Sequence, residues 1–166
     1  PYDEITVGLA KKLDETLQPC AVNMPEGVKL PEVAGRRYLA TASATCTLPD
    51  GRLAVGTKDG LFATVRDGHV FNYGNAAPMG PVRCMTVAAD GRLYGTAGDD
   101  EDMGTIFTFD DTDGLKQLGL INYNSPGWMD GPTASNVLSS IAVSADGKTL
   151  AVGGADRIGA VHLLKL

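Results

Sequence analysis

Residues 48–62 read LPDGRLAVGTKDGLF, and this stretch decides how the chain folds. It carries the pairs Asp50-Gly51 and Asp59-Gly60 on either side of a short run of apolar and β-branched residues. An Asp-Gly pair between strand-like residues favours a hairpin turn of type I′, because that turn needs positive φ at both central positions and glycine adopts it without steric cost. The stretch therefore predicts a β-hairpin unit.

The same pattern returns twice, as VAADGRLYGTAG and as VSADGKTLAVGG. Gly51 and Gly91 are 40 residues apart, and Gly91 and Gly147 are 56 residues apart. A period of about 40 residues with four strands in each unit is typical of a β-propeller blade. The longer second interval reflects an insertion over residues 122–136.

Turn residues divide the chain from residue 38 onward into runs of strand length. The first repeat predicts strands near 40–48, 52–57, 61–66 and 69–73. The second predicts strands near 82–88, 92–97, 104–109 and 115–121. The third predicts strands near 137–144, 148–153 and 159–165, and the chain ends before a fourth.

The first 37 residues differ from the rest. Ile5, Leu9, Leu13 and Leu17 recur every four residues, which predicts an amphipathic helix over residues 2–17. The alternative is a strand over EITVGL, residues 4–9. Residues 18–37 contain three prolines and show no clear periodicity, so we expect an irregular connector. The predicted organisation is an N-terminal segment, 1–37, followed by the repeats, 38–166.

Composition places the chain among folded proteins and excludes some partners. It has 166 residues and a formal charge of -6, which argues against a nucleic-acid binder. No apolar run approaches the roughly 20 residues that span a bilayer, so we expect no membrane span. Cys20, Cys46 and Cys84 are widely spaced and predict small buried residues or free thiols, with one disulfide as the alternative. The sequence assigns no compartment.

Three stretches resemble known propeller repeats. LPDGRLAVGTKDGLF is similar to the repeat of periplasmic sensor domains in hybrid two-component systems. GRLYGTAGDDEDMGTIFTF resembles the LYGT…GTVF repeats of bacterial secreted propellers, and IAVSADGKTLAVGG resembles blades of WD40-like and YVTN-like bacterial propellers. The last strand, GAVHLLKL, lacks the Trp-Asp dipeptide of true WD40 blades. The resemblance implies a blade fold and no particular activity.

We therefore expect an all-β fold: a partial β-propeller of about three four-stranded blades after a short helical or irregular segment. A β-trefoil is the alternative, because it also uses three repeats. Three blades do not close a ring, since propellers typically have four to eight. We expect further blades to complete it, from another chain, from an identical copy or from a removed part of the same polypeptide. Residues 4–9 are a candidate for the missing fourth strand of the third repeat.

The insertion is the first candidate binding site. It contains the chain's only tryptophan, Trp128, together with Tyr123, Met129 and Asp130. An aromatic loop that departs from the repeat predicts a platform for a carbohydrate or peptide ligand. The alternative is a loop that folds over the blades and buries Trp128.

Arg83 and Ser139 form the second candidate site. They lie eight residues before Gly91 and Gly147, so they occupy matching positions at the start of innermost strands. Both side chains are predicted to face the central channel, where an arginine binds a carboxylate through two hydrogen bonds. The alternative is a salt bridge between blades.

Metal and catalytic motifs are largely missing from the sequence. Residues 99–102 read DDED, and DDTDG from Asp110 matches only part of a calcium-loop pattern, so we interpret both as solvated hairpin tips. We expect no metal and no cofactor. The sequence contains no GxSxG elbow, HExxH helix or P-loop.

The leading functional hypothesis is a non-catalytic ligand- or partner-binding propeller module that other blades or another copy complete. The alternative is a propeller-type lyase or hydrolase that acts on a carbohydrate or small acid. Arg83, His69 and Asp130 are then the candidate catalytic residues. The two hypotheses differ in whether basic and acidic side chains meet in one cleft.

Overall fold

The computed structural model describes residues 32–33, 36–37, 41–67, 69–77, 80–98, 104–124, 132–134, 137–154 and 159–166. These residues form antiparallel β-sheets and turns, so the described part of the chain is all-β. Over the same ranges, no helix has the length and apolar character needed to cross a membrane.

Three antiparallel sheets make up most of the fold, and in each the strands pair in chain order. The first sheet contains β3 (Ala42–Thr47), β4 (Leu53–Thr57), β5 (Leu61–Arg66) and β6 (His69–Asn75). The second contains β7 (Val82–Val87), β8 (Leu93–Ala97), β9 (Thr105–Asp110) and β10 (Gly114–Leu120). The third contains β13 (Leu138–Val143), β14 (Thr149–Gly154) and β15 (Ala160–Lys165).

Two short strand pairs complete the described structure. They are β1 (Glu32–Val33) with β2 (Arg36–Arg37), and β11 (Asn122–Asn124) with β12 (Pro132–Ala134). The first pair lies within the predicted irregular connector, and the second lies within the predicted insertion. The predicted N-terminal helix, with its alternative strand, falls outside the described residues.

The strand predictions from residue 38 onward are confirmed. All the predicted strands of the three repeats form, each within about two residues of the expected bounds, and the third sheet has three strands in the described chain. This agreement follows from the short apolar runs between glycine-containing turns, which leave no room for a helix.

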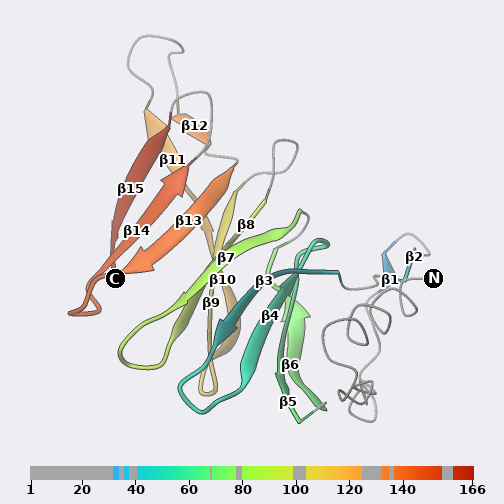
Figure 1. Ribbon diagram of the computed structural model, residues 1–166. Helices are drawn as coiled ribbons and strands as arrows, with labels where there is room; N and C mark the ends of the chain where they lie inside the picture. The colour runs from blue at the N-terminus through green and yellow to red at the C-terminus, as the bar shows by residue number, and fades with distance from the viewer. Residues whose placement is uncertain are drawn as a thin grey trace.

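The three sheets lie side by side along the chain (Figure 1). Their first strands are neighbours, because β7 contacts both β3 and β13. One core fills the space between the first and second sheets, where Phe62 packs on Phe107 and Phe109 with ring centroids 5.9 and 4.9 Å apart. A second core, which includes Leu138 and Leu150, fills the space between the second and third sheets.

The turns between the first two strands of each sheet differ from the predicted type I′. Gly51, Gly91 and Gly147 have positive φ values of 86°, 90° and 71°, whereas the aspartate before each glycine does not. Type I′ requires positive φ at both central residues, so that prediction is wrong.

The observed turn is a longer loop, and in the first two sheets glycine occupies its last position. In the first sheet the N–H of Leu48 donates to Arg52 O at 2.8 Å, and the N–H of Gly51 donates to Leu48 O at 2.9 Å. Pro49 follows Leu48 and has its φ fixed at a negative value, so glycine alone enters the left-handed region. The Asp50 Oδ1 atom accepts the N–H of Arg52 at 3.0 Å and stabilises the loop.

The turns and strand starts define two ends of the sheets. The Asp50 end contains these turns, residues 48–52, 88–92 and 144–149. The Arg83 end contains the first residues of β3, β7 and β13 together with the turn 58–60.

Candidate functional site

The first strand of each of the three large sheets carries a β-bulge at the same position. The pairing register shifts between Ala42 and Ala44, between Val82 and Cys84, and between Leu138 and Ser140. The bulged residues are therefore Ser43, Arg83 and Ser139. A bulge re-aims its side chain and is common beside functional sites.

The bulged side chains bind backbone carbonyls at the Arg83 end. Arg83 Nε donates to Gly98 O at 2.7 Å, and Ser139 Oγ donates to Gly153 O at 3.4 Å. Ser43 Oγ donates to Val82 O at 2.7 Å and so links the first sheet to the second. Arg83 uses Nε to bind the carbonyl that follows β8 of the same sheet, and within the described ranges its two terminal nitrogens form no hydrogen bond or ion pair, so they can bind a ligand.

A cavity of about 400 Å³ opens at this end between the first two sheets. Its lining residues are Ser43, Lys58, Pro81, Val82 and Arg83. Lys58 and Arg83 are exposed, and neither forms an ion pair with another residue of the described ranges. Two positive charges beside one cavity create a potential that attracts an anion.

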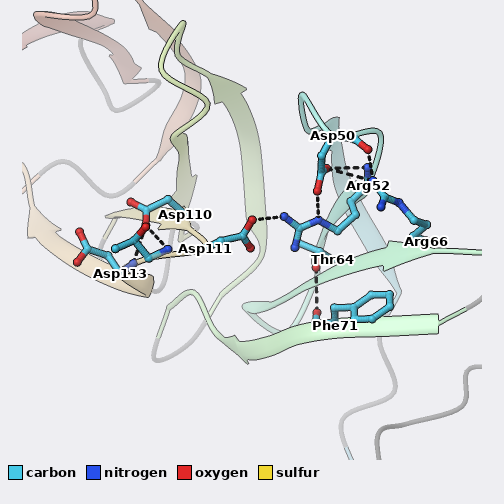
Figure 2. A network of polar contacts seen from close by, with 9 residues as sticks. Asp50, Arg52, Thr64, Arg66, Phe71, Asp110, Asp111 and Asp113 are labelled. Carbon is cyan, nitrogen blue, oxygen red and sulfur yellow. Dashed lines mark hydrogen bonds and ion pairs between the residues drawn. The ribbon is translucent and has the colours of Figure 1, made fainter.

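A second cavity, of about 280 Å³, lies at the Asp50 end, and Asp50, Arg52, Asp110 and Asp111 on its lining form ion pairs within the chain (Figure 2). Arg52 Nε lies 2.5 Å from Asp50 Oδ2, and Arg52 Nη2 lies 2.5 Å from Asp111 Oδ2. Arg66 also contacts Asp50, through an ion pair of 3.6 Å and a hydrogen bond to its carbonyl oxygen.

The acidic turn after β9 continues this network. Asp110 Oδ1 accepts the N–H groups of Thr112 and Asp113 at 2.9 and 2.6 Å. Arg92 Nη2 lies 2.8 Å from Asp110 Oδ2, in an ion pair that lacks the alignment of a hydrogen bond. Asp113 accepts a bond from Lys116, which lowers the pKa of that carboxyl. These acids act as turn and ion-pair groups, in agreement with the interpretation of DDTDG as a hairpin tip.

The structure places the predicted site residues in three groups. Arg83 and Ser139 occupy equivalent bulges, as their spacing predicted, while Arg83 also lines the cavity. Tyr123 lies in β11, and its side chain is outside the described part of the structure. Trp128 and Asp130 fall outside the described residues, as does the acidic loop 99–102.

His69 does not join Arg83. It begins β6 and pairs with Arg66, at the Asp50 end, whereas Arg83 lies at the opposite end of the first strand of the next sheet. The prediction that Arg83 and His69 act in one catalytic site is therefore wrong, because the length of a strand separates the two positions.

Two residues of the cavity were missed by the sequence reasoning. Ser43 lies eight residues before Gly51, so the spacing that identified Arg83 and Ser139 identifies it as well. Lys58 gave no such indication, because only the packing of the first sheet on the second brings its turn beside Arg83. Cys46 and Cys84 are free thiols, as predicted, and Cys20 lies outside the described residues.

Comparisons with known proteins identify structural relatives only. No protein-family model matches the chain, and no curated protein matches it. A solved candidate 6-phosphogluconolactonase from Bacteroides fragilis is 16% identical, with a TM-score of 0.44 over 74% of this chain and 38% of that one. Another candidate 6-phosphogluconolactonase, from Bacteroides uniformis, is 14% identical, with a TM-score of 0.47 over 87% of this chain and 54% of that one.

The chain thus spans between about a third and just over half of the length of these structures. Both bear an enzyme's name, 6-phosphogluconolactonase, so the leading prediction of a non-catalytic binding module is contradicted. The comparison agrees better with the alternative, a hydrolase that acts on a carbohydrate or small acid.

Proposed function

We propose that the three sheets are consecutive blades of a β-propeller and that the protein is a hydrolase acting on an anionic carbohydrate derivative. The observation that carries the substrate class is the cavity at the Arg83 end, where Lys58 and Arg83 both belong to the lining and neither has an acidic partner in the described ranges. A phosphorylated sugar lactone combines an anionic group with a hydrolysable ester.

The arrangement of the sheets supports a propeller over the alternative β-trefoil. Each sheet is an independent antiparallel meander, and the first strands β3, β7 and β13 are neighbours in space. In a propeller the first strands surround the axis, and the sheets pack face to face through apolar side chains. The two cores, one on each face of the second sheet, fit that description.

The cavity's chemistry supports binding of the anionic group. The guanidinium of Arg83 offers two terminal nitrogens that match two oxygens of a phosphate or carboxylate, and Lys58 adds a second positive charge. Ser43 has a hydroxyl on the same lining, although it already donates to Val82 O.

Hydrolysis of a lactone adds the oxygen of water to the carbonyl carbon and breaks the ring C–O bond. The ring oxygen takes a proton and becomes a hydroxyl, and the new carboxylic acid ionises near neutral pH, so each turnover releases one proton. Lys58 and Arg83 would hold the substrate's anionic group, and a separate base would activate the water. Asp130 remains a prediction for that base.

The test measures proton release by the purified protein on a 6-phosphorylated sugar lactone and on its unphosphorylated counterpart. We expect faster hydrolysis of the phosphorylated lactone. Arg83→Gln and Lys58→Gln should each raise KM for that substrate by about twofold to fivefold, the effect of one exposed charge contact. Neither change should affect the unphosphorylated lactone.

Lys116→Gln is the matched control, because Lys116 is an exposed lysine of β10 that contacts Asp113 in a turn at the opposite end of the sheets. It should leave both reactions unchanged. A rate equal to the uncatalysed rate on both lactones would refute the hydrolase, and an equal loss on both substrates would refute the anion site.

A further inference from the structure

The register of the sheets defines which residues are equivalent. The residue after each bulge pairs with Gly56, Thr96 or Gly153 of the second strand. These three residues pair in turn with the third strand, at Phe62, Ile106 and Val161 respectively. By the same register, Leu163 is equivalent to Thr64 and Thr108.

The third sheet exposes a face that the other two sheets bury. Phe62 packs against the second sheet and is 0% exposed, and Ile106 packs against the third sheet and is 5% exposed. Their equivalent in the third sheet, Val161, is 72% exposed, and Leu163 is also 72% exposed. Two large apolar side chains thus stand uncovered at the positions that a following sheet covers.

The first sheet exposes the complementary face. In the second sheet, Leu93 and Phe109 pack toward the first sheet and are 0% and 2% exposed. Leu93 on β8 is the register partner of Phe109 on β9, and Leu53 on β4 is the register partner of Val65 on β5. Leu53 and Val65 are therefore the equivalent pair in the first sheet. Leu53 is 41% exposed, so the face that would receive a preceding sheet is uncovered.

The charges at the two uncovered faces also match. Between the first and second sheets, Arg52 pairs with Asp111 at 2.5 Å. Lys148 holds the place of Arg52 in the third sheet, because its N–H donates to Asp146 Oδ1 as that of Arg52 donates to Asp50. Asp67 follows β5 as Asp111 follows β9. If the first sheet of a second copy packed on the exposed face of the third sheet, Asp67 of that copy would lie near Lys148.

We propose that two copies of this chain associate about the axis of the sheets, with the third sheet of each copy packed on the first sheet of the other. The three sheets described in each copy would together form a ring of six, which lies within the usual range of four to eight. The two-fold symmetry makes the same contact twice, so neither apolar face stays exposed to water. The proposal uses the propeller arrangement proposed above and does not depend on the hydrolase activity.

The first test is the mass of the purified protein in solution, measured by light scattering across a tenfold range of concentration. We expect about twice the 17.3 kDa of one chain. Leu163→Asp should give a folded monomer, because it places a charge in the proposed interface. The control is Leu118→Asp. Leu118 is 54% exposed and lies on β10 of the second sheet, outside the two proposed interface faces, so this variant should leave the dimer intact.

A charge exchange keeps the proposal testable if Leu163→Asp does not fold. Lys148→Glu and Asp67→Lys should each weaken dimerisation by about tenfold or more, because each places like charges together. The double variant should recover most of that loss. A monomeric wild-type protein, or a double variant no better than the single ones, would overturn the proposal and assign the faces to another part of the polypeptide or to a different protein.

Discussion

Arg52 of the first sheet and Asp111 of the second form an ion pair in which Arg52 Nη2 lies 2.5 Å from Asp111 Oδ2 (Figure 2). The Arg52 side chain is only 13% exposed and also binds Asp50, whereas Asp111 is 62% exposed. The hydrogen bond with Asp111 raises the pKa of Arg52 and outweighs the opposing effect of burial. The pair therefore fixes the Asp50 end of one sheet against the next.

Removing the acidic partner should have a small effect. Asp111→Asn is expected to lower the free energy of unfolding by less than about 1 kcal/mol, because Asp111 is largely in water and Arg52 retains Asp50. Urea unfolding of both proteins at low and high salt measures this change in the free energy of unfolding. The difference between variant and wild type should shrink as salt rises, and a loss of several kcal/mol would contradict this account.

Acid should destabilise the protein through the turn aspartates. The hydrogen bond from Ser144 Oγ lowers the pKa of Asp146 below its ordinary value of 3.8, and the N–H of Arg52 does the same for Asp50. A folded-state pKa below the unfolded one stabilises the fold fully above about 3.8, and that stabilisation is lost as the pH falls toward the lower value.

The urea midpoint should therefore decline once the pH drops below about 4. Asp146→Asn should make this decline less steep, because one of the contributing carboxyls is removed. An Asp146→Asn variant with an unchanged slope would show that this carboxyl does not contribute to the acid sensitivity.

Gly56 is required by the close approach of the first two sheets. A Cβ atom at this position would lie 2.3 Å from Val82 Cγ1 and 2.5 Å from Val82 Cβ. Gly56→Ala should cost about 1–3 kcal/mol of stability, the range for overpacking a core. Gly159→Ala is the control, because its Cβ would meet nothing within 4 Å, and its thermal midpoint should match wild type.

Thr96 joins the second sheet to the third. Its hydroxyl is fully buried and donates to Leu138 O at 2.8 Å. Thr96→Val keeps the side chain's size and removes the donor, so we expect a loss of about 1–2 kcal/mol from the unpaired carbonyl. Thr112→Val, in an exposed turn, serves as the comparison in the same unfolding experiment and should change stability little.

Local sequence was sufficient to locate the strands and the equivalence of the repeats. Alternating apolar runs and the spacing of Gly51, Gly91 and Gly147 depend on neighbouring residues alone. The turn type was mispredicted because the Asp-Gly pair is compatible with more than one loop length. The longer loop, with Asp50 Oδ1 bonded to the N–H of Arg52, is stabilised by contacts outside the pair.

Only part of the candidate site could be predicted from the sequence. Arg83 and Ser139 share a register position that can be counted, and the bulges confirm that position. Lys58 belongs to a turn whose own residues give no indication of a site. It lies beside Arg83 because the first sheet packs on the second, through residues such as Phe62 and Phe107 that are distant in the chain.

The sequence by itself determined where strands begin and end, and that the chain is built from repeats, because both depend on short-range backbone and side-chain preferences. The tertiary structure alone decided which charges of the described residues form ion pairs and which do not. Arg52 meets Asp111, Lys58 shares a cavity with Arg83, and Val161 and Leu163 remain exposed, because each outcome depends on which sheet lies against which face.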